Sequence, residues 1–217
     1  MLGVVPEVAV HRLYVDLHYK PVKQKNRTFL EEKGEAIHEE VDKLLGADAI
    51  RELLFPTWLA IVVLVPKPNG TWQMLTDFTN INKAYSMDCY PLPNIDRLVD
   101  SNASYKVVDF LDTFKGYHQI FMVEEDVENP AFVTEYAIYY WKVMAFGLNN
   151  EGATYQRMVN EVFFTQIGRN MEIYVGDVLI KSREVEDHEA NLQESFENLR
   201  RYKLRLNPNK CVFGVTS

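Results

Sequence analysis

Two aspartates stand at positions where a carboxylate could take part in chemistry. Asp112 ends the apolar segment VVDFLD, and Asp177 lies in the short hairpin pattern IYVGDVLI. Carboxylates at strand ends and hairpin tips can converge on a hard divalent ion such as Mg²⁺. Two such ions stabilise an in-line phosphoryl displacement. An aspartate in a turn more often serves only the turn itself, so residue type alone leaves both roles open.

The second half of the chain predicts the elements that would position these aspartates. Strands, helices and hairpins alternate there in the order strand, hairpin, helix, hairpin, helix, strand. The segments are a strand over 105–111, a short extended or helical piece over 118–122, a hairpin over 131–134 and 138–144, a helix over 150–166, two strands within 172–182, a helix over 186–202 and an extended end over 205–213. This order predicts an α+β fold, with an antiparallel sheet and two helices on one face in a split βαβ arrangement.

The first half has a different pattern. Residues 1–27 are basic and weakly periodic, which predicts an extended arm. Thr28 and Glu31 form a candidate capping box, and apolar residues at helical spacing follow, which predicts a helix interrupted at Gly34. Two strand-like runs around Asn69-Gly70, over 60–65 and 72–78, predict a second hairpin.

Composition sets the class of protein. The chain has 217 residues with 47% hydrophobic and 25% charged residues, which indicates a folded domain or two small lobes rather than disorder. No apolar run of about 18 residues and no secretory signal occur, so we expect no membrane span and an intracellular compartment. The net charge of −8 argues against nucleic-acid binding through overall charge. Residues 11–27, however, carry five basic residues and one acid, which leaves a local basic surface open.

Five segments occur in one order and at one spacing, namely YPLPNIDRLVD, FLDTFKGYHQI, FGLNNEGATYQRMVN, YVGDVLIKS and LNPNKCVFG. In these segments the chain resembles the reverse transcriptase domain of gypsy-type LTR retrotransposon Pol polyproteins, such as those of plant genomes. The resemblance implies the fingers and palm of a right-hand polymerase, with a ferredoxin-like palm. It implies a basic arm over 1–27, fingers over 28–95 and 123–149, and a palm over 96–122 and 150–217. The thumb and RNase H domains are expected to be absent from this chain.

The resemblance also implies the site residues. Asp112 and Asp177 match catalytic residues that bind Mg²⁺ or Mn²⁺ for two-metal nucleotidyl transfer, with an RNA or DNA template-primer and a deoxynucleoside triphosphate as partners. Tyr117 matches the residue that crowds the incoming sugar, with a core tyrosine as the alternative. The other positions that match the nucleotide and template site are Lys67, Gln73, Phe146, Gly147 and Gln156, together with Trp72, Asp77 and Lys83 of the fingers hairpin. For Lys67 a plain surface lysine, and for Gln156 a solvent-facing polar residue, remain alternatives.

Several positions depart from that pattern. Gly176 stands where the family has the first of two adjacent aspartates, and Asp109 cannot replace it because it points to the opposite face of its strand. Gly176 fits the first central position of a type II′ turn, so we expect the hairpin to form without its full chemistry. Gln73 replaces an arginine, and its neutral amide lacks the charge-assisted contact to phosphate. Further departures are Ala145, Glu151 and Pro130.

These departures predict a degenerate copy that is inactive or severely impaired as a polymerase. A working polymerase in which two aspartates suffice is the second hypothesis. A non-enzymatic module that binds nucleic acid or a partner protein is the third.

Overall fold

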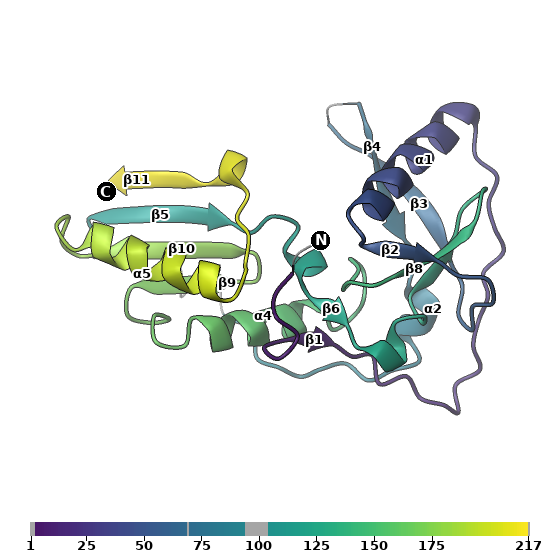
Figure 1. Ribbon diagram of the computed structural model, residues 1–217, viewed down its shortest axis with the longest axis horizontal. Helices are drawn as coiled ribbons and strands as arrows, with labels where there is room; N and C mark the ends of the chain where they lie inside the picture. The colour runs from purple at the N-terminus through teal and green to yellow at the C-terminus, as the bar shows by residue number, and fades with distance from the viewer. Residues whose placement is uncertain (1–2, 69, 94–103, 217) are drawn as a thin grey trace. The chain divides into compact units, whose positions relative to one another are not determined.

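A computed structural model describes residues 3–68, 70–93 and 104–216, and its chain divides into two compact units (Figure 1). Unit 1 contains residues 10–87 and 121–151. Unit 2 contains the described residues of 2–9, 88–120 and 152–217. The predicted start of the palm at residue 96 lies outside the described residues. Among the described helices, none is both long enough and apolar enough to cross a membrane.

Unit 2 is built on a four-stranded antiparallel sheet in the order β11-β5-β10-β9. Figure 1 shows β11, β5 and β10 side by side, with α5 packed across them. The chain order of its elements is β5, α4, β9, β10, α5 and β11. Their bounds are β5 (Val107–Asp112), α4 (Glu151–Val162), β9 (Met171–Tyr174), β10 (Asp177–Ser182), α5 (His188–Arg201) and β11 (Val212–Thr216), with the short 3₁₀ helices η1 (Gly116–Gln119) and η3 (Pro208–Lys210).

Both long helices of unit 2 lie on one face of this sheet. Asp109 of β5 contacts His188 of α5, with 3.1 Å between Oδ2 and Nε2. Thr113, just past the end of β5, accepts a hydrogen bond from the Tyr155 hydroxyl of α4 at 2.8 Å. Side chains four residues apart on an extended strand share a face, so α4 and α5 cover the same side. This confirms the predicted α+β fold with two helices on one face of an antiparallel sheet, the split βαβ arrangement.

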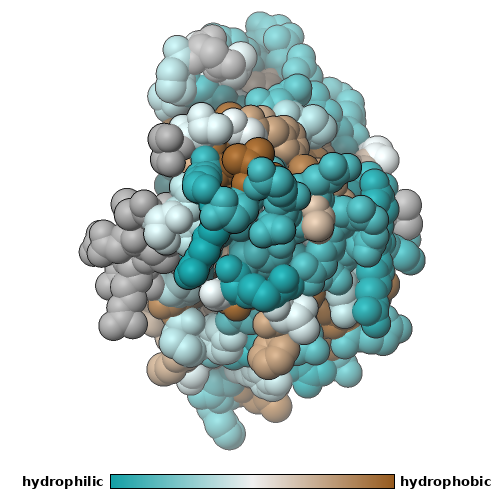
Figure 2. Space-filling model, turned by 90° about the vertical axis from the view of Figure 1, so that its left-hand side faces the viewer, coloured by the Kyte–Doolittle hydropathy of each residue, from teal (hydrophilic) through white to brown (hydrophobic). Residues whose placement is uncertain are grey.

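The surface of unit 2 is polar over α5 and more apolar over β11. Figure 2, which views the side where α5, β5 and β11 are labelled in Figure 1, shows a mostly hydrophilic surface with scattered apolar residues. Every residue of β11 is exposed, and the large apolar side chains exposed on β5 and β11 are Phe110, Val212, Phe213 and Val215. The sheet therefore ends in a short, open edge strand.

Unit 1 contains a five-stranded sheet in the order β2-β8-β7-β3-β4, in which β3 and β7 are parallel and the other pairs antiparallel. The two predicted hairpins are confirmed as β3–β4 and β7–β8. A separate two-stranded pair joins β1 to β6. The bounds in this unit are β1 (Val10–His11), α1 (Glu31–Gly46), β2 (Ile50–Glu52), β3 (Ala60–Pro66), β4 (Trp72–Thr76), α2 (Thr79–Asn82), β6 (Phe121–Met122), the 3₁₀ helix η2 (Glu124–Asp126), β7 (Ala131–Val133) and β8 (Ile138–Trp141).

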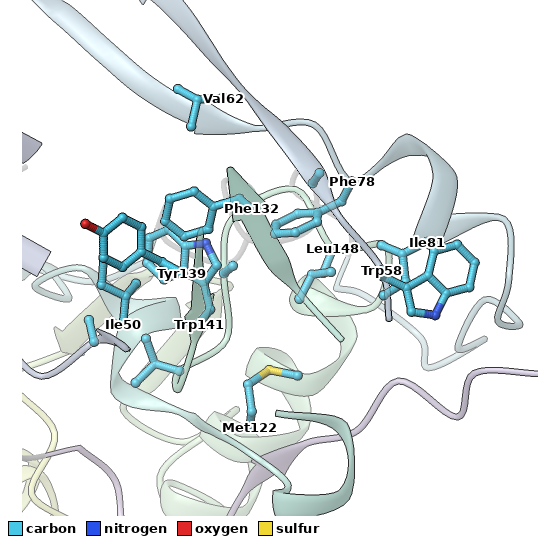
Figure 3. Packing of buried hydrophobic residues seen from close by; sticks show 14 of the residues in the cluster. Ile50, Trp58, Val62, Phe78, Ile81, Met122, Phe132, Tyr139, Trp141 and Leu148 are labelled. Atoms are coloured by element: carbon cyan, nitrogen blue, oxygen red, sulfur yellow. The ribbon is translucent and has the colours of Figure 1, made fainter. Parts of the chain in front are cut away.

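An aromatic group forms the centre of the unit 1 core (Figure 3). Phe132 is fully buried, and its ring centroid lies 5.7 Å from that of Tyr139 and 5.8 Å from that of Trp141. Each buried side chain of this size contributes roughly 1.5–3 kcal/mol relative to an exposed one. This core supports the strands that carry the fingers hairpin.

Three expectations for the first half are corrected. Helix α1 runs through Gly34 without interruption. This buried glycine lies close to Glu135, since a Cβ there would be 3.4 Å from Glu135 Oε2. The predicted capping box of Thr28 and Glu31 is wrong, because the helix begins after Leu30 and has no side-chain cap hydrogen bond. The N-terminal segment is extended as predicted but is packed into the fold, with His11 and Leu13 fully buried.

Candidate active site

The two predicted catalytic aspartates lie directly opposite each other. In the antiparallel pairing of β10 with β5, Asp177 is the register partner of Asp112. Directly opposed residues point to the same face, with Cβ atoms about 4.5–5.5 Å apart. Asp177 is exposed, and the Asp112 side chain keeps 24% of its surface exposed. The fold therefore brings these two carboxylates together at one end of the two central strands of the unit 2 sheet.

A cation and an amide approach Asp112 from the C-terminal segment. Lys210 Nζ lies 3.6 Å from Asp112 Oδ2, and Asn207 Nδ2 donates to the same oxygen at 3.4 Å. The Asn207 N–H also donates to the Asp112 carbonyl at 2.8 Å. The sequence reasoning did not single out these residues, although they lie in the segment LNPNKC. Lys210 supplies positive charge beside a carboxylate that a metal ion would otherwise share.

Gly176 occupies the second position of a two-residue turn. Tyr174 pairs with Asp177, so Val175 and Gly176 form the loop, and Val175 has the positive φ of 52°. The expectation of glycine at the first position of a type II′ turn is therefore wrong, because Val175 takes the left-handed conformation. A Cβ on Gly176 would meet only Thr113 Oγ1, at an ordinary 3.5 Å. The turn thus has room for a side chain at the position where the resemblance implies an aspartate.

The donor set fits one divalent ion better than two. No group of three or more His, Cys, Asp or Glu side chains suited to a metal occurs in the described part of the chain. Two carboxylates can hold a single Mg²⁺ that keeps several waters. A pair of ions needs shared carboxylate ligands, and the backbone turn at Gly176 offers no side chain for that role. The residues present do not fit a two-ion site.

Gln156 is buried and hydrogen-bonds to the backbone of the turn at Val175 and Gly176. It is 1% exposed, and its Oε1 accepts a hydrogen bond from the Val175 N–H at 3.0 Å. Its Nε2 donates to Asn160 Oδ1 at 3.0 Å and to the Ile173 carbonyl at 3.4 Å. The alternative of a solvent-facing glutamine is therefore wrong. Gln156 therefore acts on the turn at Val175 and Gly176 through the Val175 backbone.

Tyr117 lies in η1 and packs edge-on against Tyr155, with ring centroids 5.7 Å apart and planes at 80°. It is only partly buried, whereas Tyr155 is fully buried. Burial raises the pKa of Tyr155, so its hydroxyl stays protonated and donates to Thr113. The Thr113 N–H in turn donates to the Gly176 carbonyl at 3.2 Å. A chain of contacts thus links Tyr117 to the turn that precedes Asp177.

Phe146 and Gly147 lie on a loop of unit 1. Phe146 is 55% exposed, and Gly147 has a φ of 98°, a conformation that favours glycine. The Glu151 carboxylate accepts a hydrogen bond from the Gly147 N–H at 2.8 Å and another from the Leu148 N–H. Burial raises the pKa of Glu151 to about 7, against the lowering effect of these two bonds. The Glu151 carboxylate, at a position that departs from the family pattern, therefore holds this loop in place through two backbone hydrogen bonds.

The fingers hairpin carries the remaining predicted residues. Lys67 and Gln73 are exposed near the tip of β3–β4. The Trp72 indole donates to Glu32 of α1 at 3.2 Å, and the Lys33 ammonium lies 4.7 Å from the Trp72 ring centroid. The hairpin is therefore fastened to α1 through Trp72, with Lys67 and Gln73 left accessible.

Two further residues of that motif follow β4. Asp77 accepts hydrogen bonds from the Thr79 N–H and hydroxyl, which is the main cause of its lowered pKa. Lys83 is exposed after α2. In this structure the Asp77 carboxylate is therefore hydrogen-bonded to Thr79, the first residue of α2.

Sequence comparisons place these motifs among known proteins. Residues 65–217 match the family described as Reverse transcriptase (RNA-dependent DNA polymerase). The chain is 33% identical over 187 residues to the Retrovirus-related Pol polyprotein from transposon opus of Drosophila melanogaster, covering 83% of this chain and 18% of that protein. It is 29% identical over 202 residues to the Pol polyprotein from transposon 297 of the same organism, covering 90% of this chain and 19% of the relative. The chain therefore spans less than a fifth of each of these relatives.

Solved structures agree at the level of the fold. The prototype foamy virus protease-reverse transcriptase superposes with a TM-score of 0.84 at 21% identity, covering 94% of this chain and 27% of that one. The foamy viral protease-reverse transcriptase in complex with dsDNA superposes with a TM-score of 0.86 at 18% identity, covering 99% and 44%. Reverse transcriptases generally use divalent metal ions. On the family match over more than half of its length, this chain belongs to the reverse transcriptase (RNA-dependent DNA polymerase) family and is related to retrotransposon Pol polyproteins.

Proposed function

We propose that the chain is the fingers and palm of a gypsy-type, plant-like LTR retrotransposon reverse transcriptase, with unit 1 as the fingers and unit 2 as the palm. Support comes from the order of its five motifs and from relatives that are transposon Pol polyproteins. In the family the reaction is template-directed synthesis of DNA. The expected partners are an RNA or DNA template-primer and a deoxynucleoside triphosphate. One related foamy viral structure is a complex with an RNA/DNA hybrid, which motivates this choice of nucleic acid.

We further propose that polymerase activity is lost or severely reduced in this chain. The observation that carries this proposal is the pairing of Asp112 with Asp177 alone, with Gly176 in the turn and Lys210 beside Asp112. Charge stabilisation by metal ions is worth several kcal/mol, and each 1.36 kcal/mol is a factor of ten in rate. Loss of the shared carboxylate thus predicts a rate lower by roughly 10³-fold or more.

The other site residues have roles that do not depend on a metal ion. Tyr117 would limit space beside the sugar of a bound nucleotide, and exposed Lys67 would contact its phosphates. Gln73 would give a neutral hydrogen bond where an arginine gives a charged one. Phe146 and Gly147 would lie against the nucleotide or template, with Gln156 supporting the turn at Val175. Mg²⁺ or Mn²⁺, when bound at Asp112 and Asp177, would supply charge stabilisation there.

Primer extension on an RNA template with Mg²⁺ or Mn²⁺ tests this proposal. We expect no template-dependent incorporation by the native chain and a gain for Gly176→Asp, best measured in a longer chain that includes a thumb. Asp112→Ala in the Gly176→Asp background is the control, and it should abolish the gain. Incorporation by the native chain that Asp112→Ala removes would contradict the proposed inactivity.

A second candidate function is a non-enzymatic module that binds nucleic acid or a partner protein. The observation that favours it is the basic segment 11–27, which is held in place along unit 1. The Gln24 N–H donates to the Leu59 carbonyl at 2.8 Å, and the Leu59 N–H donates to the Val22 carbonyl at 3.1 Å. Binding through this segment needs no metal site.

A further inference from the structure

Asp109 is a buried carboxylate on the face of the unit 2 sheet that the helices cover. Its side chain is 1% exposed, and its two oxygens meet different elements. Oδ1 accepts a hydrogen bond from the Gly214 N–H of β11 at 2.6 Å. Oδ2 lies 3.1 Å from Nε2 of His188, the first residue of α5. One side chain of β5 therefore contacts both β11 and α5.

The His188 ring is also held at its other nitrogen. His188 Nδ1 lies 2.8 Å from the hydroxyl of Ser182, which is fully buried at the end of β10. The same hydroxyl accepts a hydrogen bond from Asn191 Nδ2 at 2.8 Å. Buried polar side chains connected in this way become rigid. The ring of His188 therefore restricts the orientation of the Asp109 carboxylate, whose other oxygen faces β11.

A β-bulge interrupts β11 opposite Asp109. The register pairs on either side of the bulge are Val212 with Phe110 and Val215 with Val108. Three steps along β11 thus match two steps along β5, and the extra residue falls outside the regular ladder. Gly214 lies in this bulge with a φ of 67°, a conformation that favours glycine. The Asp109 carboxylate therefore satisfies a backbone donor within the bulge.

The segment that precedes β11 contacts Asp112, which lies three residues after Asp109 on β5. The Asn207 N–H donates to the Asp112 carbonyl at 2.8 Å, and Lys210 Nζ lies 3.6 Å from Asp112 Oδ2. A shift of one residue in the register of a strand turns its side chains to the opposite face. The register of β11, which the bulge sets, therefore determines which residues of the preceding segment lie beside Asp112.

We infer that Asp109 is a positioning residue for Asp112: it fixes the bulge of β11 and thereby keeps Asn207 and Lys210 beside the Asp112 carboxylate. The inference deepens the proposed function and rests on it only in taking Asp112 as a residue of the site. Asp109 acts through the backbone of β11, from the opposite face of the sheet. It therefore has a role in the site although it cannot replace the carboxylate missing at Gly176.

Amide hydrogen exchange of the full chain, followed by NMR, tests this inference. Asp109→Leu removes the acceptor and keeps a buried side chain of similar size. The readout is the exchange rate of the Asn207 N–H divided by that of the Lys181 N–H, which donates to the Asn170 carbonyl at 2.9 Å. We expect this ratio to rise about tenfold in Asp109→Leu, because the segment beside Asp112 opens more often when the bulge loses its acceptor.

Two further variants separate positioning from general stability. Asp109→Asn is the rescue variant, because its amide oxygen can still accept from the Gly214 N–H, and it should keep the native ratio. Leu199→Ala removes a buried apolar side chain of α5 and lowers the stability of the unit without changing the bulge. It should also keep the native ratio.

A native ratio in Asp109→Leu would overturn the inference, as would an equal rise in Leu199→Ala. If Asp109→Leu does not fold, Gly214→Ala disturbs the same bulge through its positive φ, since its Cβ would meet no atom of the described residues within 4 Å. A native ratio in Gly214→Ala would then count against Asp109. Primer extension by the native chain would contradict only the proposed inactivity, so the two proposals can fail separately.

Discussion

Asp112 and Asp177 face each other across the β5–β10 pair, with Lys210 3.6 Å from the Asp112 carboxylate. Like charges directly opposite on neighbouring strands repel, so a nearby cation stabilises the pair. The Lys210 ammonium thus supplies beside Asp112 the positive charge that a bound metal ion would supply.

Gly176→Asp should fold normally and bind Mn²⁺ more tightly. The added Cβ meets Thr113 Oγ1 at 3.5 Å, and Gly176 is not among the residues with positive φ, so the unfolding free energy should change by no more than about 0.5 kcal/mol. A third carboxylate should raise Mn²⁺ affinity about tenfold, equivalent to about 1.4 kcal/mol. Calorimetric titration with Mn²⁺ and thermal unfolding would measure both.

Gly116→Ala is the contrasting control for that variant. Its Cβ would lie 2.6 Å from Thr113 Oγ1 and 2.9 Å from Tyr155 Cε2, so it should cost about 1–3 kcal/mol of stability. If Gly176→Asp destabilises the chain as much as Gly116→Ala, the turn lacks the space inferred here.

Lys210→Ala should increase the affinity of the aspartate pair for Mn²⁺. A charge about 4 Å away in a hydrated site contributes about 1 kcal/mol, which predicts a gain of about fivefold. The Lys210 side chain is largely exposed, so folding should be little affected. Arg200→Ala, an exposed cation on α5, is the control and should leave Mn²⁺ affinity unchanged. Unchanged affinity in Lys210→Ala would show that Lys210 does not compete with a metal ion.

Gln156→Leu should lower the unfolding free energy by about 1–3 kcal/mol, because the Val175 N–H loses its acceptor. Chemical unfolding in urea would measure the loss. Gln193→Leu is a matched control on α5, where the exposed Gln193 amide donates to Glu197 at 2.9 Å, and should change stability by less than about 0.5 kcal/mol. Equal effects of the two substitutions would contradict a supporting role for Gln156.

Glu151→Gln should stabilise the chain at pH 8 and leave it unchanged at pH 4.5. The folded pKa of Glu151 is about 7, above its ordinary 4.5, so the folded state retains a proton that the unfolded chain releases. The native chain therefore loses stability relative to the variant as pH rises from 4.5 through 7. After discounting for partial exposure we expect about 1–2 kcal/mol at pH 8, measured by urea unfolding.

The glutamine retains an oxygen that can accept from the Gly147 N–H, so the substitution isolates the charge. Glu161→Gln, at an exposed position of α4, provides the comparison. A stability difference for Glu151→Gln that is the same at both pH values would contradict a titrating buried carboxylate.

Local pattern was sufficient for much of this fold. The alternation in VVDFLD predicted β5 and placed Asp109 on the face opposite Asp112. The structure confirms this placement, since Asp109 is buried against His188 of α5. Turn residues between apolar runs predicted the three hairpins. The sequence also identified Gly176 as a departure, because residue identity at a motif position needs no coordinates.

Other features required the tertiary structure. Lys210 and Asp112 are far apart in the chain, and only the pairing of β11 and the adjoining segment with β5 brings them together. The choice of Val175 rather than Gly176 for the left-handed turn position depends on the register of β9 with β10. The burial of Gln156 beneath that turn depends on how α4 packs.

The sequence by itself predicted most of the helices and strands, the family motifs and, through the resemblance, a missing carboxylate at Gly176, because side-chain periodicity and residue identity are local properties. The tertiary structure alone decided which groups surround the remaining carboxylates, and that Gln24 accepts a hydrogen bond from the Ile61 N–H while Asn26 donates one to the Thr134 carbonyl. Such neighbours come from long-range packing, and residues distant in sequence meet only when strands and helices are assembled.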